Sequence, residues 1–189
     1  MNYGRRTYTM HERWANWLAL ALTVLALLSG LLLRDGVLKA TTRYEDPSEG
    51  IAAARPAGWL VEHGAGYVFR LRDPKARPFK TALQVTVLTV GPDATGRNVF
   101  DTLTLRRSAV LSGYRVLDME ETGALPKMRY VYVASEPDPF LGTLPVVVMG
   151  VDVVYFKSNQ AIVATYQASV ADFEAQYFRF ERFVDSLRY

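Results

Sequence analysis

A run of twenty residues without a charged side chain, residues 14–33, constrains this chain more than any other feature. At a helical rise of about 1.5 Å per residue, the run is about 30 Å long and matches the hydrocarbon core of a bilayer. Leu, Ala and Val dominate it, and it contains no proline. Trp14 and Trp17 lie at its start, where indole rings favour the boundary between lipid and water. We therefore expect a transmembrane helix over residues 14–33, between Arg13 and Arg34.

A cleaved secretion signal is the alternative for this segment. Residues 1–13 are basic, and their RRTY stretch is similar to a twin-arginine signal. The apolar run is longer than the roughly 7–15 residues of a signal core, however, and no small-x-small cleavage site follows it. The nearest candidate, VLKA at residues 37–40, has Leu38 where a small residue is required. We expect a retained single-pass anchor rather than a signal.

The orientation of the anchor is decided by its layout rather than by charge. Three basic residues precede the span and three follow it, so the positive-inside rule favours neither orientation clearly. The signal-like order of a basic start and an apolar run favours a cytoplasmic N-terminus. We therefore expect a plasma (inner) membrane protein with residues 1–13 as a cytoplasmic tail and its C-terminal domain in the periplasm or otherwise outside the cytoplasm.

The same helix resembles the first helix of the b-type cytochrome subunits of formate dehydrogenases and nickel–iron hydrogenases. Arg13 and Trp17 match the start of that pattern. Asn16 stands where the pattern has its haem-ligating histidine, and an amide is a poor ligand for iron, so no cofactor is expected. The small residues Ser29 and Gly30, near the C-terminal end of the run, would allow a second helix to pack closely against it. The expected anchor residues are Trp14, Trp17, Ser29, Gly30 and Leu33.

Composition excludes several classes of site. The chain has no cysteine, which rules out disulfides, thiolate metal sites and cysteine nucleophiles. Its formal charge of +3 indicates no particular partner. The densest basic run is predicted to be either a solvated loop or a contact surface for anionic lipid headgroups or an acidic protein. Nucleic acid is not expected, because no nucleic-acid motif accompanies the charge. The run contains Arg70, Arg72, Lys75, Arg77 and Lys80.

The remaining residues predict a polar linker over residues 34–55 and one folded domain over residues 56–189. Residues 81–90 alternate apolar and polar side chains and predict a strand with Leu83, Val85 and Val87 on one face. Residues 128–134 predict another strand, with Tyr130 and Tyr132 on one face. Two long apolar runs joined by KSNQ, residues 157–160, predict an antiparallel hairpin.

Two helices are predicted in the domain. The first covers residues 98–112 and ends at Gly113, with Arg106 and Arg107 on a solvated face. Its apolar side is expected to carry Phe100, Leu103, Val110 and Leu111. The second follows a cap formed by Ser169 with Asp172. Its apolar stripe packs on the sheet and contains Phe173, Tyr177, Phe180, Val184 and Leu187.

The domain as a whole resembles the PsbP-like family, the accessory proteins of the oxygen-evolving photosystem and their bacterial relatives. The resemblance implies an α+β fold: an α/β/α sandwich around a twisted antiparallel sheet. It also implies a non-catalytic docking or stabilising role. A retained anchor departs from the many relatives that are soluble or lipid-anchored, so a photosynthetic role does not carry over. The matching residues are Pro56-x-Gly58-Trp59, Tyr67-Val68-Phe69, Leu83-x-Val85-x-Val87, Tyr130-x-Tyr132, Ile162-Val163-Ala164-Thr165 and Val184-x-Ser186-Leu187.

No catalytic motif emerges from the residues. His11 and His63 lack the spacing of metal ligands, and there is no G-x-S-x-G, G-x-G-x-x-G or P-loop sequence. Asp152, in an apolar strand, is interpreted as an outward-facing position. Phe140 is a candidate partner contact on a proline-containing loop. One further acidic group fits no known calcium loop, so no metal is expected; its members are Asp118, Glu120, Glu121, Glu136 and Asp138.

These observations predict a non-enzymatic, single-pass accessory subunit that docks to and stabilises a larger membrane complex of energy transduction, respiratory or photosynthetic. Its expected partners are the lipid bilayer and other subunits of that complex. The alternative is a free membrane-tethered domain that binds a small ligand or an envelope component.

Overall fold

The computed structural model describes residues 10–38, 40–121, 125–135 and 144–189. The chain divides into two compact units, Met1–Ala40 and Thr41–Tyr189. The first unit contains one helix, α1 (Met10–Leu38), which is 29 residues long. Both clusters of buried apolar side chains belong entirely to the second unit. This second unit therefore has a complete core of its own.

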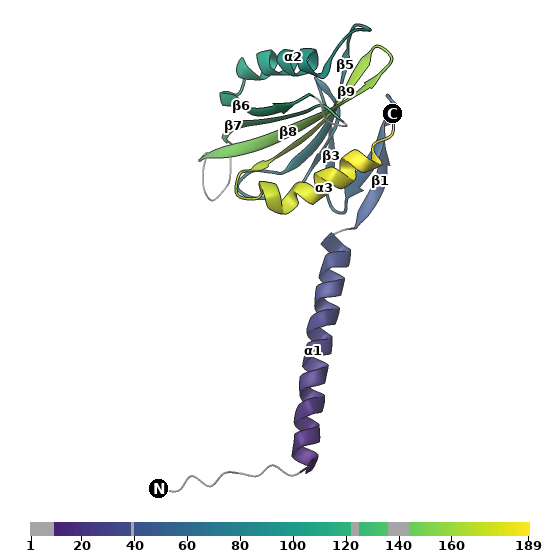
Figure 1. Cartoon of the computed structure of the whole chain (residues 1–189), viewed down its shortest axis with the longest axis vertical. Coiled ribbons are helices and arrows are strands. Elements are labelled where there is room, and N and C mark those ends of the chain that lie inside the picture. Colours follow the sequence, from purple (N-terminus) through teal and green to yellow (C-terminus); the bar gives the residue numbers. More distant parts are fainter. Residues whose placement is uncertain (1–9, 39, 122–124, 136–143) are drawn as a thin grey trace. The chain divides into compact units, whose positions relative to one another are not determined.

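The second unit is built around a seven-stranded antiparallel sheet with the order β3-β4-β5-β9-β8-β7-β6 (Figure 1). Helix α2 (Gly96–Ser108) covers one face and helix α3 (Phe173–Ser186) covers the other. The predicted α/β/α sandwich is confirmed. The strands are β3 (Leu60–Gly64), β4 (Tyr67–Arg72), β5 (Ala82–Thr89), β6 (Ser112–Glu120), β7 (Lys127–Ser135), β8 (Pro145–Lys157) and β9 (Gln160–Ser169).

The predicted alternation and hairpin are both present. Leu83 and Val85 on β5 are fully buried on the α3 side. Gln84 and Thr86 point to the opposite face, where the amide of Gln84 donates to the hydroxyl of Thr86 over 3.0 Å. Strands β8 and β9 pair over ten residue pairs, ending at Lys157 opposite Gln160.

Helix α3 buries an aromatic stripe against the sheet, as its spacing predicted. Phe173 and Phe180 are 1% exposed, and Phe183, which the predicted stripe omitted, is fully buried. The ring of Phe180 stacks on Tyr166 of β9 with centroids 5.6 Å apart. The hydroxyl of Ser169 accepts from the backbone N–H of Asp172 and donates to its carboxylate, but Ser169 does not cap the helix as predicted. The N-cap residue is Asp172, and its side chain makes no capping hydrogen bond.

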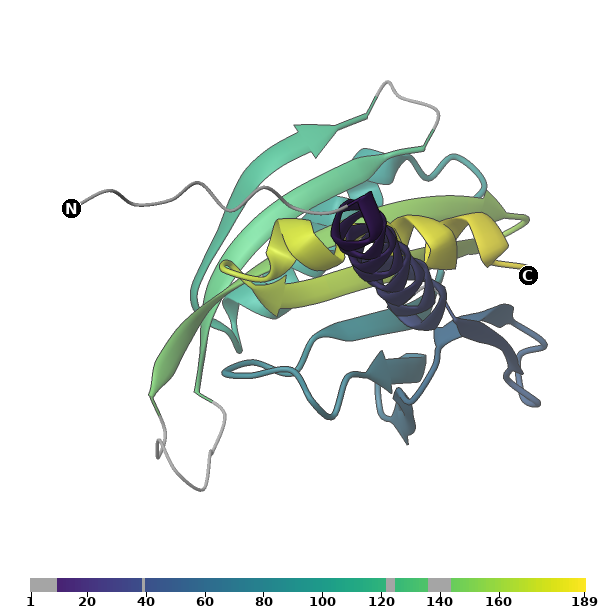
Figure 2. The same ribbon diagram turned by 90° about the horizontal axis from the view of Figure 1, so that it is seen from below.

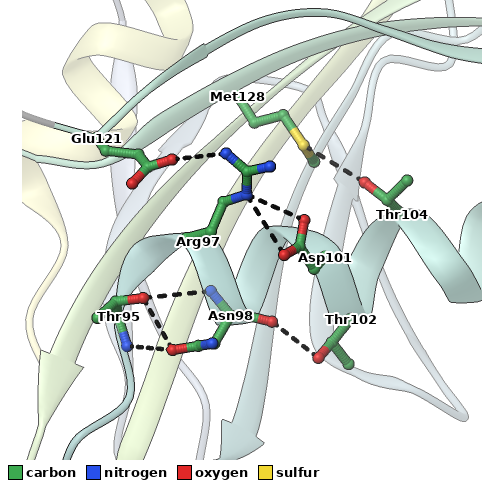
Figure 3. Close-up of polar contacts among 8 residues, drawn as sticks. All are labelled: Thr95, Arg97, Asn98, Asp101, Thr102, Thr104, Glu121 and Met128. Atoms are coloured by element: carbon green, nitrogen blue, oxygen red, sulfur yellow. Dashed lines mark hydrogen bonds and ion pairs between the residues drawn. The ribbon is translucent and has the colours of Figure 1, made fainter.

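Helix α2 has a capped start and ends earlier than the sequence indicated. Thr95 and Asn98 form a capping box (Figure 3). The helix stops at Ser108 rather than at residue 112, and Val110 is 78% exposed instead of packed. The reason is a tight turn into β6, in which Leu111 donates to the carbonyl of Arg107 and Gly113 adopts a φ of +63°.

The segment predicted as a linker, residues 34–55, is not a linker throughout. The end of α1 occupies its start, and the hairpin of β1 (Thr41–Glu45) and β2 (Ala52–Pro56) follows. The hairpin is joined to the end of the chain, because Ala52 and Arg188 exchange two backbone hydrogen bonds of 2.9 and 2.8 Å. Ala52 and Ala53 are almost completely buried. The folded unit thus begins at Thr41 instead of Pro56, because small buried alanines gave no strong strand pattern.

Candidate functional site

Helix α1 contains a 20-residue segment, Trp14–Leu33, that is long and apolar enough to cross a membrane. None of this segment is buried within the part of the chain that the structure describes. Trp14, Trp17 and Leu33 are each about 70% exposed, and Ser29 and Gly30 are exposed as well. The hydroxyl of Thr23 donates to the carbonyl of Ala19, so this polar group is satisfied within the helix. By length and composition, an anchor and a signal sequence both fit such a helix.

The basic run is divided between a strand and a loop. Arg70 and Arg72 lie on β4 and are only partly exposed. The guanidinium of Arg70 donates two hydrogen bonds, of 3.0 and 2.7 Å, to the side-chain oxygen of Gln84 and lies over the ring of Tyr67. Arg72 forms an ion pair of 3.6 Å with Glu62. These two arginines are thus held against the sheet by neighbouring strands.

The other three basic side chains follow β4 in the loop to β5. Lys75 and Arg77 are exposed, whereas Lys80 is partly buried. Arg77 and Lys80 both donate to the carbonyl of Pro74, over 3.1 and 3.3 Å. The most solvent-accessible charges of the run are therefore Lys75 and Arg77. Phe140, the other predicted contact, lies outside the described residues.

The interpretation of Asp152 as outward-facing, and of Arg107 as solvated, is wrong. Helix α2 lies over that face of the sheet, and Asp152 is completely buried. Both nitrogens at the end of the Arg107 guanidinium donate to the Asp152 carboxylate, and the hydroxyl of Thr165 donates to it over 2.6 Å. Burial alone lowers the pKa of Arg107, but the charge of Asp152 raises it above its ordinary value. The Arg107 guanidinium therefore stays charged under α2.

The ring of Tyr130 packs against the Arg107 guanidinium of this buried ion pair. The Arg107 guanidinium carbon lies 4.4 Å from the centre of the Tyr130 ring, and the Tyr130 hydroxyl accepts from Gln167 over 3.0 Å. The ring lies across Gly150, where a Cβ atom would overlap it. Burial raises the pKa of Tyr130, so its hydroxyl stays neutral. These contacts are structural, because these polar side chains form their hydrogen bonds with other side chains of the domain.

His63 joins the β1–β2 hairpin to the sheet. Its Nε2 lies 3.1 Å from the hydroxyl of Tyr44, and its Nδ1 lies 3.1 Å from the carbonyl oxygen of Val68. Nδ1 is also 3.7 Å from the carboxylate of Asp46. The side chain is 56% exposed, in line with the expected surface position. Among the described residues, no group of three or more His, Asp or Glu is arranged to hold a metal ion.

Two adjoining hollows lie on the α2 side of the sheet, and Arg106 lines both. The larger, of about 730 Å³, lies between the end of β5 and α2, and Asn98, Thr102 and Asp93 line it. The other, of about 500 Å³, reaches the turn at Ser48 and Glu49. Their volumes fall in the usual range of ligand pockets.

A third hollow, of about 440 Å³, lies on the α3 side between that helix and strand β7. Its apolar part includes Val153 and Phe180, both buried, and its polar part includes the side chain of Lys127. The Lys127 nitrogen lies 5.8 Å from the centre of the Tyr177 ring. None of the three hollows was foreseen, because each is formed by residues that are distant in the sequence.

Comparison with known proteins identifies the fold but no sequence family. No family model and no curated protein sequence matches the chain. Cyanobacterial PsbP from Synechocystis sp. PCC 6803 is similar in structure, with a TM-score of 0.53 at 15% identity over 79% of this chain and 92% of its own. The Ran-binding protein Mog1p of Saccharomyces cerevisiae has a TM-score of 0.52 at 10% identity, over 79% and 95%.

LpqN of Mycobacterium tuberculosis, described as involved in cell envelope biogenesis, has a TM-score of 0.49 at 10% identity, over 78% of this chain and 89% of its own. At such identities, these likenesses concern the fold alone. With its two helices on opposite faces of a seven-stranded antiparallel sheet, the unit Thr41–Tyr189 has the PsbP-like fold.

Proposed function

We propose that this protein is a non-catalytic accessory subunit, anchored in the plasma membrane by α1, whose PsbP-like domain docks to a larger membrane protein complex. One observation carries the proposal. None of the apolar segment Trp14–Leu33 is buried among the described residues, so its surface needs a bilayer or other membrane helices around it. In this proposal the N-terminus lies in the cytoplasm and the domain lies outside it.

The short connection between the two units supports a role at the membrane surface. Only residues 39 and 40 separate the end of α1 at Leu38 from the start of β1 at Thr41. On so short a connection, the domain is expected to act close to the membrane that holds α1.

The contacts made by the buried Asp152 and by the surface residue His63 support a non-catalytic role. The carboxylate of Asp152 is occupied by Arg107 and Thr165. His63 is held by Tyr44 and Val68 at the surface. A general base must be free to reach the proton that it removes, and these groups are committed to structural contacts. The resemblance of α1 to b-type cytochrome helices favours a complex of energy transduction, respiratory or photosynthetic.

A membrane-tethered domain that binds a small ligand is the second candidate. It is favoured by the two hollows that share Arg106 on the α2 side. Its test is thermal unfolding of residues 41–189 with panels of metabolites and lipids. A ligand that raises the melting temperature in the unaltered domain, but not in Arg106→Ala, would favour this candidate.

Docking is tested by affinity purification of the full chain from its native membranes in mild detergent. The expected result is a reproducible set of membrane proteins that co-purify with it. Two variants distinguish the contribution of the domain from that of the helix. One is residues 41–189 alone, and the other is a chain whose residues 14–33 are replaced by an unrelated apolar helix. Recovery of the full chain by itself, under several mild detergents, would contradict the proposal.

A further inference from the structure

The hollow on the α3 side combines an apolar floor with an acidic rim. Leu125 and Val184 join the buried Val153 and Phe180 in its floor. Around them stand three carboxylates, from Glu120 at the end of β6 and from Glu181 and Asp185 on α3, against the single ammonium of Lys127. The whole chain has a formal charge of +3, so the negative balance here is local.

The three carboxylates are not neutralised by the described part of the chain. No ion pair of Glu120, Glu181 or Asp185 with another described side chain is present, although all three residues are exposed. Glu181 and Asp185 lie four residues apart on α3, a spacing that places like charges beside each other and destabilises a helix. A cation from outside the chain would relieve this repulsion.

The contact of Lys127 with Tyr177 indicates how a cation is held here. The Lys127 nitrogen lies 5.8 Å from the centre of the Tyr177 ring, and the ring itself lines the hollow. The face of an aromatic ring attracts ammonium and guanidinium groups. The hollow thus already places one ammonium group over an aromatic wall, with the unneutralised carboxylates beside it.

We infer that this hollow is a socket for a lysine or arginine side chain of the protein to which the domain docks. Such a side chain has an aliphatic stem that suits the floor and a cationic head that suits the rim. An anionic membrane surface would be repelled by the same carboxylates. A bare metal ion would leave the apolar floor without a partner. The inference rests on the proposed docking function and names the chemistry of its partner.

An uncovered part of the sheet extends the socket into a larger contact surface. Figure 2 shows β6 and β7 continuing beyond α3 on this face. Val131, opposite Met149, and Val133, opposite Val147, lie on the same face of β7 as Lys127. Val133 is 37% and Val147 50% exposed. From Lys127 to Val133 the strand advances about 20 Å. The partner segment is therefore expected to place an apolar residue about 20 Å from its basic residue.

The socket is tested first without the partner. Residues 41–189, which contain the complete core, are titrated with a tri-lysine peptide while backbone amide shifts are recorded by NMR. The expected shifts are confined to the surroundings of Tyr177, Glu181 and Asp185, weaken with added salt, and fall at least fivefold in the double variant Glu181→Gln/Asp185→Asn. Absence of shifts at millimolar peptide, or equal shifts in the double variant, would overturn the inference.

The same double variant is then introduced into the full chain for affinity purification. Recovery of the partners is expected to fall at least tenfold, with an unchanged melting temperature of the domain. The matched control is Asp101→Asn/Glu174→Gln, which removes the same charge from exposed positions that line none of the three hollows and is expected to leave recovery unchanged. Equal recovery with the socket variant would overturn the inference, whereas an unaltered chain that recovers no partner contradicts the docking function and leaves the peptide titration to decide the socket.

Discussion

The two faces of the sheet are covered by helices of similar length but are held together differently. The face under α3 is packed with aromatic and aliphatic side chains, among them Phe69, Tyr166 and Phe183. The face under α2 also has an apolar cluster, and its helix is tied to β8 by the ion pair of Arg107 with the fully buried Asp152. The ion pair of α3, between Arg179 and Asp73, joins that helix to the loop after β4 and is partly exposed. The hydrophobic effect is non-directional, whereas a bidentate guanidinium–carboxylate pair requires a defined geometry. We infer that this ion pair fixes the position of α2.

The largest effect is expected from breaking the ion pair on one side. Arg107→Ala leaves the Asp152 carboxylate buried without its counter-charge and also removes the contact with Tyr130. The free energy of unfolding should fall by about 3–5 kcal/mol, measured by urea denaturation of residues 41–189.

The double variant Arg107→Met/Asp152→Leu is the control for that prediction. Replacing both charges by apolar groups of similar size is often neutral or stabilising. Stability near that of the unaltered domain would agree with the account. A double variant as unstable as Arg107→Ala would mean that packing, rather than the uncompensated charge, explains the loss.

The next largest effect is expected on the other face, from Phe183→Ala. Phe183 is fully buried and its ring lies edge-on to Phe69, with centroids 6.3 Å apart. Removing it should cost about 3 kcal/mol, the lower end of the range for such truncations, because α3 is at the surface and can settle toward the sheet. The exposed Phe156→Ala is the comparison and should cost much less. Similar losses at the two positions would refute the assignment of the α3 core.

A smaller effect is expected where β8 passes under Tyr130. A methyl group in Gly150→Ala would overlap the Tyr130 ring and should cost about 2 kcal/mol by overpacking. Gly91→Ala is the matched control, since beyond its chain neighbours no atom lies within 4 Å of the place that the added methyl group would occupy, and its backbone is unstrained. If thermal unfolding gave the two variants equal stability, the packing of Tyr130 across β8 would be wrong.

The smallest effect concerns the pH dependence of the β1–β2 hairpin. The hydroxyl of Ser48, and then the backbone N–H groups of Glu49 and Ser48, lower the pKa of the buried Asp46 carboxyl below its ordinary value of 3.8. A carboxyl with a lowered folded-state pKa stabilises the fold above about pH 4, and this contribution is lost as the pH falls through that lower value.

Asp46→Asn removes this pH-dependent contribution. The variant should therefore be less stable than the unaltered domain at pH 7, by a margin that shrinks as the pH falls below 4. Melting temperatures of the two proteins between pH 7 and pH 2 provide the measurement. A margin that stays constant over this range would show that the charge of Asp46 contributes nothing.

The same two faces show what the sequence can predict. The stripe on α3 and the alternation on β5 were correct, because both depend on the periodicity of neighbouring residues. The ion pair was missed because Arg107 and Asp152 are 45 positions apart and each looks like a surface residue in its own segment. The β1–β2 hairpin was missed for a similar reason, since Ala52 and Ala53 are buried through contacts with the far end of the chain.

The hollows, including the socket, were also missed because residues that are distant in the sequence form them. Glu120 and Asp185 are 65 positions apart, and only the crossing of α3 over the sheet brings them to one hollow. By contrast, the long apolar segment Trp14–Leu33 was recognised at once, because length and absence of charge are local properties.

The central claim, a membrane-anchored subunit that docks to a larger complex, is tested most directly by the size of the particle that contains the chain. The tagged full-length protein is extracted from its native membranes in mild detergent and sedimented through a gradient. The account predicts that most of it sediments with a complex much larger than one 189-residue chain in a micelle. It also predicts that Glu181→Gln/Asp185→Asn shifts it to the position of the single chain. If the unaltered protein sediments as a single chain in every mild detergent, the account is contradicted.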